Sequence, residues 1–197
     1  MRGEFRLALV LLGSLYVASE SLADDQQQNL NSSLKGVFRS VGINNCLESQ
    51  GGFTSNLLFQ VNGFAARYQE NTMSTAVFPG DGTMTDNVRG TTYFQGDPYN
   101  PGNFGAGTFI GTCQYTFNMN PNKSFTLKGS CNGSSPLGPA INTTSTLTGV
   151  VHHAQLSDDG NTIIIGNPEP NAQLLALSNQ YSAQRLCGTS ATYVRVR

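Results

Sequence analysis

Cys113 and Cys131 lie symmetrically about Asn122, and this spacing constrains the fold more than any other feature of the chain. In an antiparallel hairpin centred on Asn122, the two cysteines face each other and successive side chains alternate between two faces. One face is apolar and carries Tyr115, Phe117, Met119, Phe125 and Leu127. Directly opposite residues in a sheet lie about 4.5–5.5 Å apart at Cα, which a disulfide can bridge. The segment therefore predicts a half-buried hairpin with a defined register and a disulfide.

The other two cysteines, Cys46 and Cys187, then form the second pair of an exported chain. Four cysteines allow three connectivities, and the hairpin argument favours Cys113–Cys131 with Cys46–Cys187. The longer bridge closes a loop that the chain-entropy relation makes worth about 4–5 kcal/mol. If both bridges form, no thiolate is left as a nucleophile or a metal ligand, and we expect neither a metal nor a cofactor.

The first residues are typical of a secretory signal peptide. Arg2 and Arg6 precede an apolar run over 7–17, which is too short to cross about 30 Å of hydrocarbon, and Ser21-Leu22-Ala23 offers a cleavage site. We expect residues 1–23 to be removed and the mature chain to be periplasmic or extracellular, without a transmembrane segment. Residues 24–33 are polar and are expected to be disordered, and residues 34–197 have the length of one domain.

The charge pattern argues against partners that need a basic surface. The chain has a formal net charge of −1, and its scattered charged residues make up 12%, against about 25% in ordinary soluble domains. Binding to nucleic acid or to anionic lipid needs a concentrated positive patch, so neither is expected. Thr, Ser, Asn and Gly instead suit an exported all-β protein with many tight turns.

The rest of the chain reads as strands separated by turns. Gly96–Gly107 and Asn132–Ile141 are rich in Gly, Pro and Asn and predict two long loops, while 51–67 has no clear pattern. Pro168 and Pro170 predict a break near the end. Eight to ten short strands in sequential order favour one all-β domain, an antiparallel up-and-down β-barrel. The strands are expected over 34–41, 73–77, 84–88, 109–119, 125–131, 144–156, 162–165, 174–177, 181–186 and 192–197.

Several of these short segments resemble a group of uncharacterised exported bacterial proteins of lipocalin-like (calycin-type) β-barrel architecture. The resemblance covers most of the mature chain and is carried mainly by its turns: Gly36-Val37-Phe38, Gly51-Gly52-Phe53, Phe78-x-Gly80-Asp81-Gly82, Tyr115-x-Phe117, Leu147-x-Gly149, Ser157-Asp158-Asp159-Gly160, Pro168-Glu169-Pro170 and Arg185-Leu186-Cys187. The chain departs from the group after Cys187 and in having Cys113 and Cys131. The resemblance implies the fold and the exported compartment, and it assigns no activity.

His152 and His153 are the only histidines, and they are adjacent within a predicted strand. Neighbouring strand residues point to opposite faces, so the two cannot bind one metal ion together. One of them should face the interior, as a hydrogen-bonded core histidine or as a polar group contacting a ligand. No serine can be matched to a histidine and an acid, so we do not expect an enzyme.

Three kinds of function are compatible with these features. The first is binding of a small hydrophobic ligand inside the barrel, with Tyr115 and the inward histidine as polar anchors. The second is an envelope or interaction protein with a solid core, whose two long loops contact a protein partner. The third is an isomerase- or cyclase-type enzyme. A membrane-spanning barrel is weaker still, because the expected strands are short. The ligand-lining side chains would be Tyr115, Phe117, Phe125, Leu127, His152 or His153, Met73, Val77, Met84 and Val88.

Overall fold

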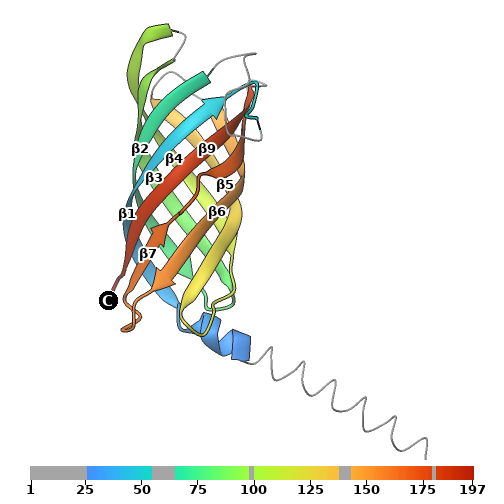
Figure 1. The fold of residues 1–197 in the computed structure, drawn as a ribbon. Coiled ribbons are helices and arrows are strands. Elements are labelled where there is room, and N and C mark those ends of the chain that lie inside the picture. Colours follow the sequence, from blue (N-terminus) through green and yellow to red (C-terminus); the bar gives the residue numbers. More distant parts are fainter. Residues whose placement is uncertain (1–25, 55–64, 98–99, 138–142, 179–180) are drawn as a thin grey trace, which may run out of the picture.

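The computed structural model describes residues 26–54, 65–97, 100–137, 143–178 and 181–197, and the predicted signal peptide lies outside them. Nine strands form one antiparallel sheet (Figure 1). They are β1 (Gly36–Ser49), β2 (Ala65–Phe78), β3 (Thr83–Asp97), β4 (Asn100–Thr116), β5 (Ser124–Leu137), β6 (Thr143–Leu156), β7 (Thr162–Gly166), β8 (Asn171–Leu177) and β9 (Ser182–Arg195). No helix among the described residues is long and apolar enough to cross a bilayer.

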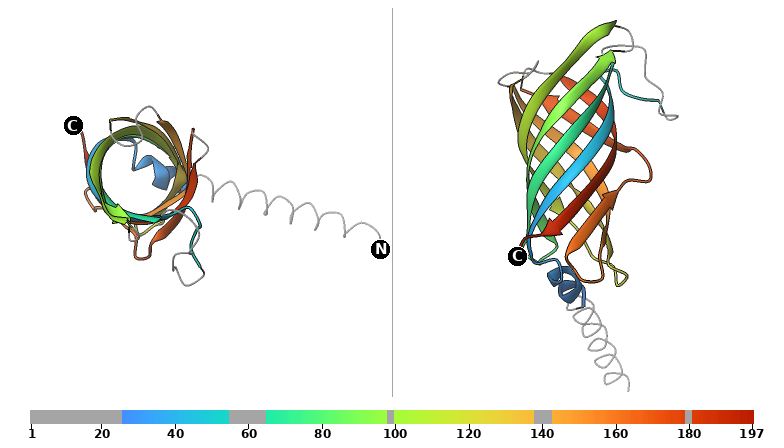
Figure 2. Two further views of the ribbon diagram at one scale, coloured as in Figure 1. Left: turned by 90° about the horizontal axis from the view of Figure 1, so that it is seen from above. Right: turned by 90° about the vertical axis from the view of Figure 1, so that its left-hand side faces the viewer.

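Pairing of β1 with β9 closes the sheet into the predicted up-and-down barrel. Each strand from β1 to β6 pairs with the next one along the chain, and the last strand, β9, pairs with the first. Seen along its axis, the molecule is a closed ring (Figure 2). Inward and outward side chains therefore alternate along every strand, and the sequence of each strand decides what fills the interior.

The strands β7 and β8 share one position in the barrel wall, because both lie between β6 and β9. The chain leaves the wall at Pro168-Glu169-Pro170, where the prolines predicted a break. Two asparagines flank the Pro168–Pro170 segment. Their side chains hydrogen bond to the part of the β6 backbone that has no neighbouring strand there. Asn167 accepts from the amide of His153 at 3.1 Å and donates to the carbonyl of Val151 at 3.0 Å. The amide of Val151 donates to Asn171 at 3.1 Å.

The β4–β5 hairpin has the predicted register. Cys113 lies opposite Cys131, and Tyr115 lies opposite Gly129. Both predicted disulfides are present, with Cys113–Cys131 joining β4 to β5 and Cys46–Cys187 joining β1 to β9 across the closing seam. An L side chain at 129 would overlap the carbonyl of Gln114, so glycine is required where the backbones approach.

The end of the barrel that holds the β2–β3 turn is filled by a packed core. Phe78 contacts the rings of Phe38 and Phe117 edge-on, with centroids 5.3 and 5.8 Å apart, and Phe117 contacts Phe125 at 5.3 Å. Further buried residues complete this core: Leu34, Met84, Met119, Leu127, Leu156 and Ile163. The aromatic face of the hairpin therefore lies mostly in a solid layer.

A short helix over 26–32 lies across this end, so the expectation of disorder for 24–33 is wrong for the part that the structure describes (Figures 1 and 2). Leu34, just after the helix, is fully buried in the core. Asn31 is also buried, and its Oδ1 accepts from the amide of Met119 at 3.0 Å. Composition predicted disorder because the segment is polar, but Asn31 and Gln27 hydrogen bond to the backbone of Met119 and Leu30 packs against the core.

The two predicted long loops are mostly strand, so the expected short strands are also wrong: seven of the nine have 14 to 17 residues. The β3–β4 hairpin pairs as far as Asp97 with Asn100 and extends beyond its neighbours (Figure 1). The register of β4 with β3 is irregular between Gln95 and Asp97, and among the described residues the pairing of β4 with β5 begins at Thr108. Only 98–99 and 138–141 of the two segments lie outside the described residues, as do 55–64 of the unassigned region.

Met73 and Val77 do not line the interior as predicted. They are 51% and 41% exposed on the outer face of β2, whereas Met84 and Val88 on β3 face inward. The turn between Phe78 and Thr83 pairs Val77 with Thr85, and residues directly opposite share a face. The spacing of the apolar residues in the sequence did not by itself predict which face of β2 Met73 and Val77 occupy.

Candidate functional site

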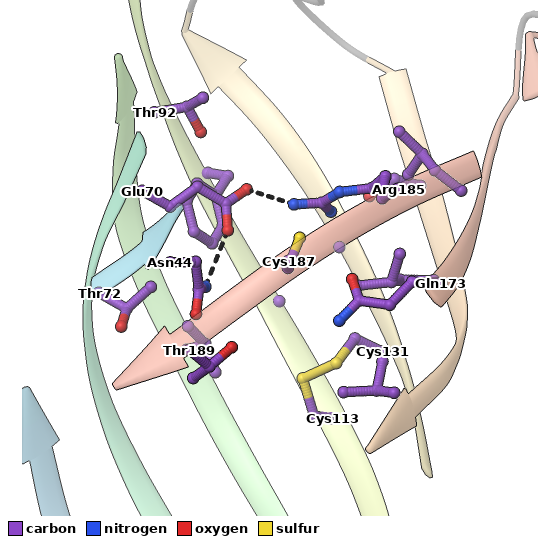
Figure 3. Close-up of a pocket in the computed structure, with 18 of the residues that line it drawn as sticks. Asn44, Glu70, Thr72, Thr92, Cys113, Cys131, Gln173, Arg185, Cys187 and Thr189 are labelled. Atoms are coloured by element: carbon purple, nitrogen blue, oxygen red, sulfur yellow. Dashed lines mark hydrogen bonds and ion pairs between the residues drawn. A yellow bond between two sulfur atoms is a disulfide. The ribbon is translucent and has the colours of Figure 1, made fainter. Parts of the chain in front are cut away.

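Above the packed core, the other half of the barrel encloses a cavity of about 410 Å³. Its walls combine apolar and polar side chains, and Figure 3 shows those of β1, β2, β8 and β9 converging on the same space. The apolar lining includes Val88, Phe94, Phe109, Leu147, Leu175 and Leu177. The charged or titratable lining is Glu48, Tyr68, Glu70, Asp86, Tyr115, His152, Tyr181, Arg185 and Tyr193. The two disulfides also border it.

The predicted ligand-lining residues divide between this cavity and the core. Tyr115 and His152 line the cavity, with ring centroids 5.8 Å apart. Phe117, Phe125 and Leu127 instead lie in the packed core, where their side chains contact one another and leave no space for a ligand. His153 points outward and is hydrogen bonded to Thr126 at 3.3 Å. The opposite orientation of the two histidines is as predicted.

A charged cluster lies in the part of the cavity farthest from the core. Arg185 on β9 donates to Glu70 on β2 at 3.0 Å, and Asn44 on β1 donates to the other oxygen of Glu70 at 2.9 Å (Figure 3). The guanidinium also lies 5.0 Å from the centre of the Tyr68 ring. Only 8% of the Arg185 side chain is exposed, so the ion pair is shielded from water.

Two tyrosines hold the second carboxylate of this cluster. Tyr68 and Tyr181 donate to the two oxygens of Glu48, at 3.1 and 2.8 Å. Burial raises the pKa of Tyr68 well above its ordinary value, so this phenol stays protonated and remains a donor. The cluster is thus an ordered polar wall made by strands β1, β2 and β9.

A second polar group lies deeper, next to the core. Asp86 on β3 is 3% exposed, and its Oδ2 accepts from the hydroxyl of Tyr193 at 2.8 Å. Burial raises the pKa of Asp86, against the lowering effect of hydrogen bonds from Ser74 and Tyr193. Ser74 is in turn hydrogen bonded to Ser40 at 2.6 Å. A carboxyl group is therefore held at the floor of the cavity by hydroxyl groups alone.

His152 is the third polar feature. Burial, together with the neighbouring His153, lowers the pKa of His152 to about 4, so its imidazole is neutral at pH 7. The adjacent Tyr115 hydroxyl lies 3.6 Å from the sulfur of Cys131. The imidazole can therefore accept a hydrogen bond from a molecule in the cavity through whichever ring nitrogen is unprotonated.

Four buried polar atoms of the described residues have no hydrogen-bond partner, and all four belong to side chains that line this one cavity. They are Asp86 Oδ1, His152 Nδ1, Gln173 Oε1 and Arg185 Nε. Leaving one such atom unpaired costs about 1–3 kcal/mol, so native proteins rarely gather several in one place without a function. Within the described ranges, no three histidine, cysteine, aspartate or glutamate side chains cluster as a metal site would need.

Sequence reasoning missed Arg185, Glu70, Asp86 and Gln173. The usable signal was the alternation of side chains along a strand. Arg185 is two residues before Cys187 and shares its face, so an inward-facing Cys187 implies an inward-facing arginine. No family model, curated protein or solved structure matches the chain. The cavity therefore has to be interpreted from its own residues.

Proposed function

We propose that this protein is an exported binding protein that holds one small amphipathic molecule inside its barrel. The observation that carries the proposal is the convergence of four unpartnered buried polar atoms on one partly apolar cavity. The cavity volume of about 410 Å³ lies within the roughly 300–1,000 Å³ of small-molecule sites. A scaffold protein with a solid interior would have no reason to keep this space open.

Two further features support the proposal. The apolar run and cleavage site of residues 1–23, with two disulfides, favour an oxidising compartment outside the cytoplasm. Binding rather than catalysis is favoured because both cysteine pairs are oxidised and His152 bonds no hydroxyl group of the described residues. The ligand we propose has an apolar body, which contacts Phe94, Phe109 and Leu147. It also has polar groups, which hydrogen bond to the four unpartnered atoms.

The test uses one substitution that fills the cavity and one that does not. Thr189 and Thr192 both lie on β9, but Thr189 lines the cavity and Thr192 is exposed on the outer face. The chain has no tryptophan, so Thr189→Trp and Thr192→Trp each introduce a single fluorescent reporter. An environment-sensitive dye, 1-anilinonaphthalene-8-sulfonate, and a panel of small amphiphiles are titrated into each mature protein.

We expect saturable binding to the wild type and to Thr192→Trp, and at least a tenfold weaker binding to Thr189→Trp. Circular dichroism and a cooperative urea transition establish that all three proteins are folded. Absence of saturable binding to the folded wild type, across dye and panel, would overturn the proposed function.

A further inference from the structure

The charge inside the cavity is unbalanced. Three carboxylates line it, those of Glu48, Glu70 and Asp86, and only one side chain with a permanent positive charge, Arg185, does so. Arg185 is already paired with Glu70 at 3.0 Å, and Glu48 is held by neutral phenols. Within the described part of the chain, the interior is therefore a site of net negative charge.

Asp86 is the carboxylate with the least compensation. Only 3% of Asp86 is exposed. The described residues contain two ion pairs, and Asp86 takes part in neither of them. The hydroxyl groups of Tyr193 and Ser74 stabilise this carboxylate without balancing its charge, and its Oδ1 has no hydrogen-bond partner. A buried carboxylate without a counter-ion is strongly unfavourable, which favours any cation that can reach it from the cavity.

Most of the four unpartnered buried atoms are hydrogen-bond acceptors, so a ligand that binds them must supply donors. Asp86 Oδ1 and Gln173 Oε1 accept, and His152 Nδ1 accepts when the neutral ring carries its proton on Nε2. Arg185 Nε is the one donor of the four. A carboxylate ligand, such as a fatty acid, would satisfy that donor and would add negative charge to a cavity that already has an excess of it.

Resting on the proposed function, we infer that the ligand is a small amine with an apolar or aromatic body, whose protonated nitrogen binds Asp86 at the cavity floor. The hydroxyl of Tyr193 donates to Asp86 at 2.8 Å, and Tyr115 lines the same cavity. The apolar wall above them receives the body of the ligand.

The experiment compares two series of three ligands, and within each series the ligands share one apolar body and differ in the polar group. Tryptamine, tryptophol and indole-3-propionate are titrated into the wild type, Asp86→Asn and Asp158→Asn, together with dodecylamine, dodecanol and dodecanoate. Asp86→Asn keeps the shape and removes the charge. Asp158→Asn is the matched control, because Asp158 is fully exposed in a surface pair with Lys123.

We expect the amines to bind the wild type and Asp158→Asn at least tenfold more tightly than the alcohols, and the carboxylates to bind most weakly. Asp86→Asn should lose the preference for the amine and still bind the alcohol. If alcohol or carboxylate binds as tightly as the amine, the inference is wrong while the proposed function stands. If no ligand or dye binds, the proposed function fails as well.

A second measurement does not depend on any variant. Ser74, Tyr193 and Tyr115 lie around Asp86, and the other titratable groups that line the cavity are His152, Glu48, Glu70 and Arg185. The two phenols stay protonated, and the titration stops at pH 5 because His152, whose pKa is lowered to about 4, becomes charged below that. Protonation of Asp86 removes the charge that holds the ammonium, so amine affinity should fall as the pH decreases from 7 to 5, and alcohol affinity should not. An amine preference that is unchanged over this range would contradict the assignment to Asp86.

Discussion

The two disulfides should differ in their contribution to stability, because they close loops of very different length. Cys46 and Cys187 are separated by 141 residues and Cys113 and Cys131 by 18. The chain-entropy relation makes the longer bridge worth about 5 kcal/mol and the shorter one about 3 kcal/mol. Opening the barrel seam should therefore cost about 2 kcal/mol more than opening the hairpin, although both bridges join paired strands in the same sheet.

Single substitutions keep the comparison clean. Cys187→Ala opens the long bridge and leaves Cys46, whose sulfur accepts from Arg185 at 3.4 Å. Cys113→Ala opens the short bridge and leaves Cys131, which contacts the Tyr115 hydroxyl. The remaining thiol is alkylated only in a parallel control, to detect intermolecular disulfides.

The free energy of unfolding is measured by urea denaturation, and the melting temperature by circular dichroism. A difference of about 2 kcal/mol corresponds to a melting temperature about 4–8 °C lower for Cys187→Ala than for Cys113→Ala. Equal losses, or a larger loss for Cys113→Ala, would refute the argument from loop closure and would show that native packing around the sulfurs decides.

Three further predictions follow from burial. Because burial raises the pKa of Asp86, its proton binds more tightly in the folded state; the resulting stability is present below the unfolded pKa and is lost as the pH rises through the folded one. Asp86→Asn should therefore raise the free energy of unfolding of the empty protein by about 1 kcal/mol at pH 7, with a smaller gain at pH 4 in urea titrations. Phe117→Asp should abolish folding, at a cost of about 4 kcal/mol or more, because Phe117 lies in the core; a folded Phe117→Asp protein, seen by circular dichroism, would contradict this placement. Asn31→Ala should lower the free energy of unfolding by about 1–3 kcal/mol, because it leaves the buried amide of Met119 unpaired. Ser32→Ala, at an exposed position, should lower it by less than about 0.5 kcal/mol in the same assay.

Local pairing made much of the fold predictable. The hairpin register followed from two cysteines and the alternation of side chains between them, and closure into a barrel followed from the sequential order of strands. The residues at which strands end were harder to predict from the sequence. Strand pairing uses backbone amide and carbonyl groups, which Gly, Asn and Ser also carry. The segment after Thr92 therefore remained in the sheet despite its turn-forming composition.

The candidate site was predictable only in part. Tyr115 was placed in the interior by the hairpin, and the inward histidine by its position in a strand. The extent of the packed core could not be predicted from the sequence, because it depends on the height along the barrel axis at which each ring lies. For this reason Phe117 was assigned to the ligand cavity and not to the core. The Arg185–Glu70 pair joins two strands that are distant along the chain, and its contact depends on the closing register of β1 with β2 and β9.

The interrupted wall between β6 and β9 makes the barrel a natural candidate for a split protein. Asn167 and Asn171 complete the bonding of β6 on either side of Pro168-Glu169-Pro170, whose residues are exposed. A cut at Glu169 would leave every strand in place, and the bridge from Cys46 to Cys187 would keep the two pieces covalently joined. Without that bridge, the two pieces become separate fragments whose reassembly around β6 could report on the proximity of proteins fused to them.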